Sequence, residues 1–146
     1  MVMVCLLLIL QGEPAAGEEK MPLPKVLIFS RNQSDGENLS SILGPERYDI
    51  FWTENGPETI VQALTGNLDA VVIFLQKRGH RELEYIPCLN SIDEALPVVV
   101  ISDHDSLKLQ REIRKHRVFY YLPQPVEADE IRAVMGDAIA SSEKRK

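Results

Sequence analysis

The side chains best suited to catalysis or metal binding are two cysteines and three histidines, and they are scattered along the chain. Cys5 and Cys88 each lack the close cysteine neighbour that is typical of a zinc site or a disulfide framework. His80, His104 and His116 are not at metal-ligand spacing either. No Ser-His-Asp set, phosphate-binding loop or metal motif is visible. The sequence therefore predicts neither an enzyme nor a metal centre, and its cysteine use favours a reducing cytoplasm.

A second place for chemistry is the segment Ser30–Gly36, which joins an apolar run to a stretch of helical character. It offers hydroxyl groups, Arg31 and Gly36 ahead of a helix start, where backbone amides can hold an anion. It lacks the run of hydroxyl residues found in flavodoxins, and no aromatic residue is clearly placed to stack on a flavin. A small-molecule or anion binder is therefore kept as an alternative function.

Length and composition describe one globular domain. The chain has 146 residues, of which 45% are hydrophobic and 26% charged, enough for a single core but not for two. Its 16 basic and 22 acidic residues give a net charge of -6, which argues against holding nucleic-acid phosphates through a general positive field. We therefore expect no direct binding to nucleic acid.

Residues 1–20 form an N-terminal extension in which the apolar run Met1–Leu10 precedes a polar stretch. The run is shorter than the roughly 20 residues that span a bilayer, and no basic residue precedes it, so stable membrane insertion is not expected. Translation that starts at Met21 is favoured, because the sequence then leads directly into the first strand. A weak export signal and an extra strand or amphipathic piece are the alternatives.

From Lys25 onward, short runs rich in β-branched residues alternate with stretches of helical periodicity. Strands are expected at 25–29, 48–53, 68–75, 97–102 and 118–122, and helices at 34–43, 57–64, 105–115 and 127–140, with a loop to about residue 86 followed by a short helix. This alternation predicts an α/β domain over residues 21–141. Its expected fold is a five-stranded parallel sheet, doubly wound as a flavodoxin-like three-layer sandwich, with chemistry at the carboxyl ends of the strands. Residues 142–146 are expected to form a basic, solvated tail.

Individual residues predict where the helices begin, end and face the core. Ser34 and Glu37 form a capping box at the start of the first helix, and Pro87 must break or start the helix that contains it. Gly44 with Pro45 and Gly66 are expected to end helices. By three-four spacing, the predicted inner faces consist of Ile60, Val61 and Leu64 in one helix and of Ile131, Val134, Met135, Ala138 and Ile139 in the last.

The order and spacing of the strand segments resemble the receiver domain of two-component response regulators. Residues 121–126, Tyr-Leu-Pro-Gln-Pro-Val, followed by Asp129-Glu130-Ile131, are similar to the family's fifth strand end, where an aromatic, a hydrophobic and a variable residue precede Lys-Pro. Residues 97–102, 68–74 and 25–29 resemble the fourth, third and first strands. The resemblance implies a receiver-like fold and a place in phosphorelay signal transduction.

The resemblance also maps the family's phosphorylation site onto this chain. That site needs an aspartate after the third strand, two acidic residues after the first that help to hold Mg²⁺, a Ser or Thr after the fourth, and a Lys after the fifth. The matching positions hold Phe74, Ser30 with Arg31, Ser102 and Gln124. Only Ser102 fits the pattern.

Phosphotransfer and Mg²⁺ binding are therefore expected to be lost, so no cofactor is expected. A phenylalanine side chain has no nucleophilic oxygen, and Arg31 places a cation where the metal requires anionic ligands. We expect a closed polar patch capped by Phe74, in which Gln124 and Ser102 bond to each other or to the Arg31 region. Pro125 is expected to keep the cis peptide bond typical of this turn in the family.

A candidate interaction face surrounds Tyr121. In phosphorylatable relatives the aromatic residue at this position moves inward on modification and remodels the surface of the fourth helix, fifth strand and fifth helix. Tyr121 is equally compatible with plain strand packing. Positive charge from Lys108, Arg111, Arg114 and Lys115 would frame this face, although a solvated helix surface explains these residues as well.

The leading hypothesis is a cytoplasmic, phosphorylation-independent pseudo-receiver that acts as a protein-interaction module in bacterial-type signal transduction. Its expected partner is a protein, such as a histidine kinase or a component of transcription or signalling, and homodimerisation is left open. A conventional phosphorelay receiver stays as an alternative that rests on overall resemblance alone.

Overall fold

Five short apolar runs form a single parallel sheet. The computed structural model describes residues 22–76 and 81–145 of the chain. The strands are β1 (Lys25–Phe29), β2 (Asp49–Thr53), β3 (Ala70–Leu75), β4 (Val98–Ser102) and β5 (Tyr120–Pro123). They lie in the order β2-β1-β3-β4-β5, and every neighbouring pair is parallel. This topology confirms the predicted doubly wound sheet.

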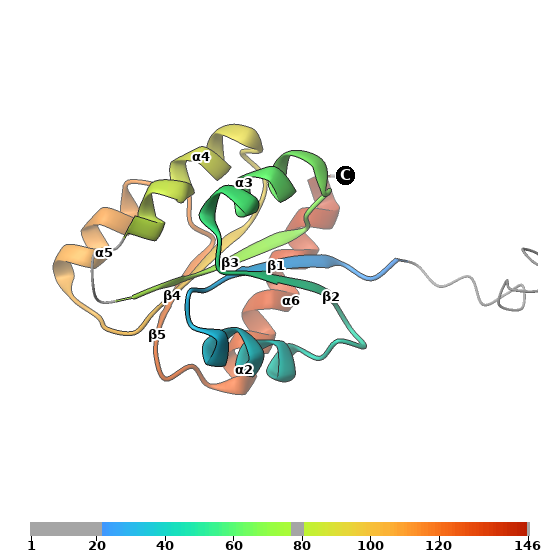
Figure 1. The fold of residues 1–146 in the computed structure, drawn as a ribbon, viewed down its shortest axis with the longest axis horizontal. Coiled ribbons are helices and arrows are strands. Elements are labelled where there is room, and N and C mark those ends of the chain that lie inside the picture. The colour runs from blue at the N-terminus through green and yellow to red at the C-terminus, as the bar shows by residue number, and fades with distance from the viewer. Residues whose placement is uncertain (1–21, 77–80, 146) are drawn as a thin grey trace, which may run out of the picture.

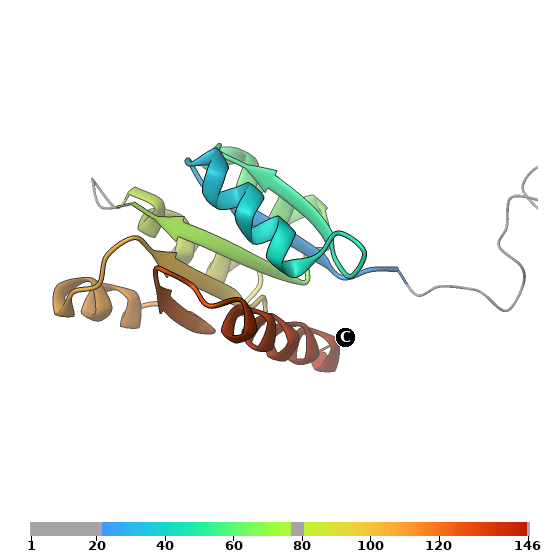
Figure 2. The same ribbon diagram turned by 90° about the horizontal axis from the view of Figure 1, so that it is seen from below.

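Helices cover both faces of the sheet, which gives the predicted three layers (Figure 1). They are α2 (Gln33–Leu43), α3 (Gly56–Thr65), α4 (Tyr85–Ile92), α5 (Leu107–Arg114) and α6 (Ala128–Arg145), with one 3-10 turn at Arg81–Glu84. Helices α2 and α6 lie on one face of the sheet, as Figure 2 also shows. Helices α3, α4 and α5 pack on the other face.

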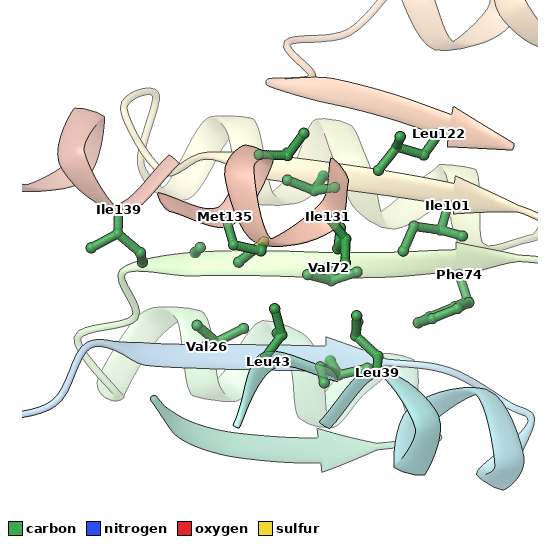
Figure 3. Packing of buried hydrophobic residues seen from close by; sticks show 14 residues of the cluster. Val26, Leu39, Leu43, Val72, Phe74, Ile101, Leu122, Ile131, Met135 and Ile139 are labelled. Carbon is green, nitrogen blue, oxygen red and sulfur yellow. The ribbon is translucent and has the colours of Figure 1, made fainter. Parts of the chain in front are cut away.

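The two central strands explain why the sequence shows continuous apolar runs instead of alternation. Every residue of β3 and β4 is buried, because side chains on both faces of these strands contact helices. Residues such as Val72 and Ile101 point toward α2 and α6, where they meet Leu39 and Met135 (Figure 3). Their neighbours in the strands form a second cluster beneath α4 and α5.

The N-terminal cap of helix α2 is Asn32 and not the predicted Ser34. The Asn32 side chain accepts hydrogen bonds from the backbone amides of Ser34 at 2.8 Å and Asp35 at 3.3 Å, while its own backbone is extended. Ser34 therefore lies inside the helix, and Glu37 instead accepts a bond from the side chain of Gln33 at 2.8 Å. The capping-box prediction was wrong by two residues, whereas the predicted end at Gly44, with φ of 92°, is confirmed.

Gly36 allows α2 to lie close to the edge of the sheet. A Cβ atom added at Gly36 would come within 2.5 Å of Cδ1 of Trp52 on β2, which is closer than carbon atoms approach. The helix therefore passes directly over the indole ring. This contact holds the first turns of α2 against the sheet, next to the carboxyl ends of the strands.

Helix α3 presents only part of the predicted face to the core, because Ile60 packs there while Val61 and Leu64 do not. Val61 and Leu64 are 50% and 64% exposed, whereas Thr59 is buried and Ile60 and Ala63 pack against the core. The helix contacts β1, β2 and the neighbouring helix α4, and the side of it that carries Val61 and Leu64 faces solvent. Its predicted end at Gly66 is confirmed.

The last helix continues past the predicted end at residue 140. All five residues predicted for its inner face are buried. The helix then runs to Arg145, so residues 142–145 are helical and were wrongly predicted as a tail. Ser142 is buried, and its hydroxyl donates to the Asp69 carboxylate at 3.4 Å. This contact gives the extra turn a partner at the amino-terminal edge of the sheet.

Residues 81–86 are helical, where a loop was predicted. One 3-10 turn, Arg81–Glu84, leads directly into α4 at Tyr85, so Pro87 falls in the first turn of the helix, where its missing amide costs little. The predicted N-terminal extension and the Met21 start lie outside the described residues.

Candidate functional site

The carboxyl edge of the sheet brings together the five positions that the sequence singled out. The Ser30 amide donates to the Thr53 carbonyl at 3.0 Å, and the Gln124 amide donates to the Ser102 carbonyl at 2.7 Å. In the β3–β4 register Phe74 lies beside Ile101. Asp69 precedes β3 at the opposite edge, so it cannot replace a carboxylate at this site.

Phe74 belongs to the hydrophobic core. Its side chain is 4% exposed and lies on the α2 and α6 side of the sheet, at the carboxyl end of β3 near Leu39 and Ile101 (Figure 3). An aromatic ring at this point contributes apolar contact area and offers no group that can be acylated or phosphorylated.

Arg31 is paired with a carboxylate that the sequence analysis missed. Its Nε atom lies 3.0 Å from Oε2 of Glu82, whose side chain is only 4% exposed, while the Arg31 side chain is 47% exposed. The other oxygen of Glu82 is buried without a hydrogen-bond partner among the described residues. Glu82 comes from the 3-10 turn, 51 positions from Arg31, so no local pattern pointed to it.

Ser102 is fully buried and holds the turn after β4. Its hydroxyl donates to the His104 carbonyl and accepts from the His104 amide at 3.1 Å. The Nδ1 atom of His104 lies 2.9 Å from an Asp103 oxygen and 3.5 Å from the Ser102 hydroxyl. Because one ring nitrogen faces both groups, these residues do not form a Ser-His-Asp relay.

Gln124 extends toward α2. Its Nε2 atom lies 3.5 Å from Oδ1 of Asp35, and the Gln124–Pro125 peptide bond is cis, as predicted. The polar side chains at this edge thus form three separate local pairs: Arg31 with Glu82, Ser102 with His104, and Gln124 with Asp35. The predicted single closed patch is wrong, because Arg31, Ser102 and Gln124 each bond to a different partner.

A cavity of about 390 Å³ opens beside Phe74, between α2 and the turn from β5 to α6. We call it the Phe74 cavity. It is lined by Asp35, Asn38, Leu39, Ile42, Phe74, Ile101, Gln124, Pro125 and Val126. This cavity was not predicted from the sequence.

The loop Ser30–Gly36 is closed by its own hydrogen bonds. The Ser30 hydroxyl bonds to the backbone of Asn32, and the Asn32 side chain takes the amides of Ser34 and Asp35. The Gly36 amide donates to the Asn32 carbonyl. Because the amides that would hold an anion are already occupied, this geometry disfavours the phosphate-binding alternative.

Tyr121 is held by the turn that follows β4. Its hydroxyl donates to the Asp105 carboxylate at 3.0 Å and lies 3.3 Å from the His104 carbonyl, and its ring packs against the core on the α5 side. Burial, together with the bond to Asp105, raises the pKa of Tyr121 to about 12. Bonds from Gln110 and then Tyr121 lower the pKa of Asp105. The folded domain therefore favours the neutral phenol.

Replacing Tyr121 by Phe should flatten the dependence of stability on high pH. The folded-state pKa lies above the usual value of 10.0, so this phenol stabilises the folded state below pH 10.0 and loses that effect as the pH rises through about 12. Urea unfolding across this range measures the free energy of wild type and variant. Tyr120→Phe, at a position 43% exposed on the same strand, is the matched control and should follow the wild type. Parallel profiles for wild type and Tyr121→Phe would contradict the assignment.

The basic residues predicted for the interaction face are all exposed, on α5 and at its C-terminal cap. They are Lys108, Arg111, Arg114 and Lys115. Lys115 also contacts Glu112 at 3.1 Å. Leu107, which precedes Lys108 on α5, is 68% exposed, and Phe119 and Tyr120 at the start of the edge strand are 39% and 43% exposed. The surface thus combines positive charge with apolar side chains.

Within residues 22–76 and 81–145, no cluster of three His, Cys, Asp or Glu residues could hold a metal ion. In the same part of the chain, every helix is too short or too polar to cross a bilayer.

Comparison with solved structures identifies the fold. The chain is similar to a CheY-like response regulator receiver domain protein from Methanospirillum hungatei, with a TM-score of 0.76, 13% identity, and coverage of 85% of this chain and 99% of that one. A response regulator receiver domain from Clostridium thermocellum has a TM-score of 0.74 and 17% identity, with coverage of 85% of this chain and 100% of that one. A response regulator from Thermotoga maritima has a TM-score of 0.70 and 17% identity, with coverage of 81% of this chain and 98% of that one. No family model and no curated protein matches the sequence. At these identities the likeness establishes the receiver fold.

Proposed function

We propose that this protein is a phosphorylation-independent receiver-like domain, which acts in the cytoplasm as a protein-interaction module in signal transduction. The observation that carries the proposal is Phe74, a buried ring at the carboxyl end of the strand where phosphorylatable receivers carry their aspartate. Arg31 and Glu82 add an ion pair near the position where such receivers hold Mg²⁺. The residues around Phe74 thus support packing in place of phosphotransfer.

Incubation with Mg²⁺ and acetyl phosphate should leave the intact mass of the protein unchanged. Phe74 has no oxygen that can attack the donor, and Ser30 and Arg31 supply no carboxylate for the metal. Electrospray mass spectrometry at neutral pH is the measurement. A receiver domain with an intact acidic site, treated in parallel, shows that the donor is active. A phosphoryl adduct that is labile like an acyl phosphate would refute the proposal.

The partner-binding surface in this proposal is formed by α5 and the edge strand β5. Its basic residues favour an acidic protein surface, and the exposed Leu107 of α5 supplies apolar contact area. A histidine kinase or a transcription or signalling component of that character is the proposed partner, and nucleic acid is disfavoured by the net charge of -6.

Charge reversal on α5 should abolish partner capture. The variant Lys108→Glu/Arg111→Glu changes two exposed charges on adjacent turns, and pull-down with the purified full-length chain measures binding. The matched control is Arg47→Glu/Lys25→Glu, which changes two exposed basic residues outside this surface. We expect the control to capture the same proteins as the wild type. Equal loss in both variants would show that net charge alone, and not this surface, determines binding.

A further inference from the structure

The Phe74 cavity has the dimensions of a small-molecule site. Its volume of about 390 Å³ falls within the range of roughly 300–1,000 Å³ that is usual for ligand pockets. It lies between two elements that are distant in sequence, helix α2 and the β5–α6 turn. The proposed interaction surface on α5 lies on the other face of the sheet, so the cavity is separate from it.

The lining divides into an apolar floor and a polar rim. Leu39, Phe74 and Ile101 are each at most 4% exposed and form the floor, with Ile42 and Val126 beside them. An apolar group in the cavity would lie over this floor and pack against the more exposed Ile42, Pro125 and Val126. The polar side chains that line the cavity are Asp35, Asn38 and Gln124, each less buried than the floor.

The rim favours a positively charged group. Asp35 is the one charged residue among the described residues that line the cavity, and Asn38 and Gln124 each add a carbonyl oxygen. The bond between Gln124 and Asp35 is long, at 3.5 Å, so a stronger donor can replace it. An anion would instead be repelled by the Asp35 carboxylate, because no basic residue lines the cavity to offset that repulsion.

We infer that the Phe74 cavity binds a small organic cation, with an aromatic or compact apolar body on the Phe74 floor and an ammonium group at Asp35. The charge of the rim selects the amine, and the floor selects the apolar body. This site goes beyond the proposed interaction function and does not depend on it, because either can fail while the other holds.

Three probes that share an indole ring and a two-carbon arm test the inference: tryptamine, tryptophol and indole-3-propionate. They differ only in whether the end group is cationic, neutral or anionic. Calorimetric titration of the full-length protein measures each affinity. We expect tryptamine to bind about tenfold or more tighter than indole-3-propionate, with tryptophol in between, as a charge-assisted bond to a carboxylate requires.

Substitutions test which residues determine the preference for tryptamine. Asp35→Asn should remove most of the preference for tryptamine, whereas Glu37→Gln, which makes the same charge change on the same helix outside the cavity, should keep it. Asn38→Trp, at an exposed rim position, should weaken all three probes by filling the mouth. Thermal unfolding verifies that each variant is folded. The inference is overturned if no probe binds at millimolar concentration, if indole-3-propionate binds as tightly as tryptamine, or if the preference survives Asp35→Asn.

Discussion

Replacing Phe74 by Asp should lower the free energy of unfolding by about 3 kcal/mol or more, although it supplies the carboxylate that a phosphorylatable receiver needs. The substitution removes a ring that is 4% exposed, and truncating a buried Phe typically costs about 3–5 kcal/mol. It also introduces a charged group beside Leu39 and Ile101, and none of the residues that line the adjoining cavity is a cation. The variant should still fail to accept a phosphoryl group, because Ser30 and Arg31 supply no metal ligands.

The matched control is Phe74→Leu, which keeps an apolar side chain and should cost only about 1 to 2 kcal/mol. Urea unfolding followed by circular dichroism measures all three proteins. If Phe74→Asp is as stable as Phe74→Leu, the site accommodates a carboxylate without penalty. The ring would then have no special part in the packing of this edge.

Replacing Arg31 by Met should lower the free energy of unfolding by about 1–3 kcal/mol. The reason is Glu82, whose buried carboxylate loses its cation at 3.0 Å and already has one oxygen without a partner among the described residues. Breaking a fully buried pair costs about 3–5 kcal/mol. Here the expected cost is smaller, because the Arg31 side chain is 47% exposed and water can replace part of the interaction.

A double-mutant cycle separates this pair from ordinary packing. Arg31→Met/Glu82→Leu should recover most of the stability lost in Arg31→Met, since the uncompensated charge is gone. Lys115→Met, which breaks the exposed contact to Glu112, should change stability by at most about 1 kcal/mol. Additive effects of the two substitutions at Arg31 and Glu82 would contradict the pairing.

The strands could be predicted because their apolar runs encode burial directly. Both faces of β3 and β4 are covered by helices, so all six residues of β3 and all five of β4 are buried. The predicted bounds of these two strands differ from the observed bounds by at most two residues. Helix ends were less predictable. Asn32 and Ser34 are both good caps by type, and the choice depends on which backbone is extended. The face of α3 also depends on its place over the sheet edge, which no local pattern contains.

The sequence predicted where the residues of the candidate site lie, but not which residues they bond to. Ser30, Phe74, Ser102 and Gln124 reach one edge because parallel strands end together there. Two pairs at this edge join residues that are far apart in the chain: Gln124 lies 89 positions from Asp35, and Arg31 pairs with Glu82 of the 3-10 turn. Such pairs arise only when the topology is assembled. The predicted polar patch therefore failed, although its members lie where expected.

An amide spectrum of the labelled protein, recorded before and after addition of Mg²⁺ and acetyl phosphate, tests the central claim most directly. In a phosphorylatable receiver the signals at the site and on the distant strand face change together, because modification shifts the domain between two conformations. We predict that the signals of Phe74, Ser102 and Tyr121 keep their positions, since the donor finds no acceptor. Coordinated shifts of these residues, with a phosphoryl adduct in the same sample, would contradict the account.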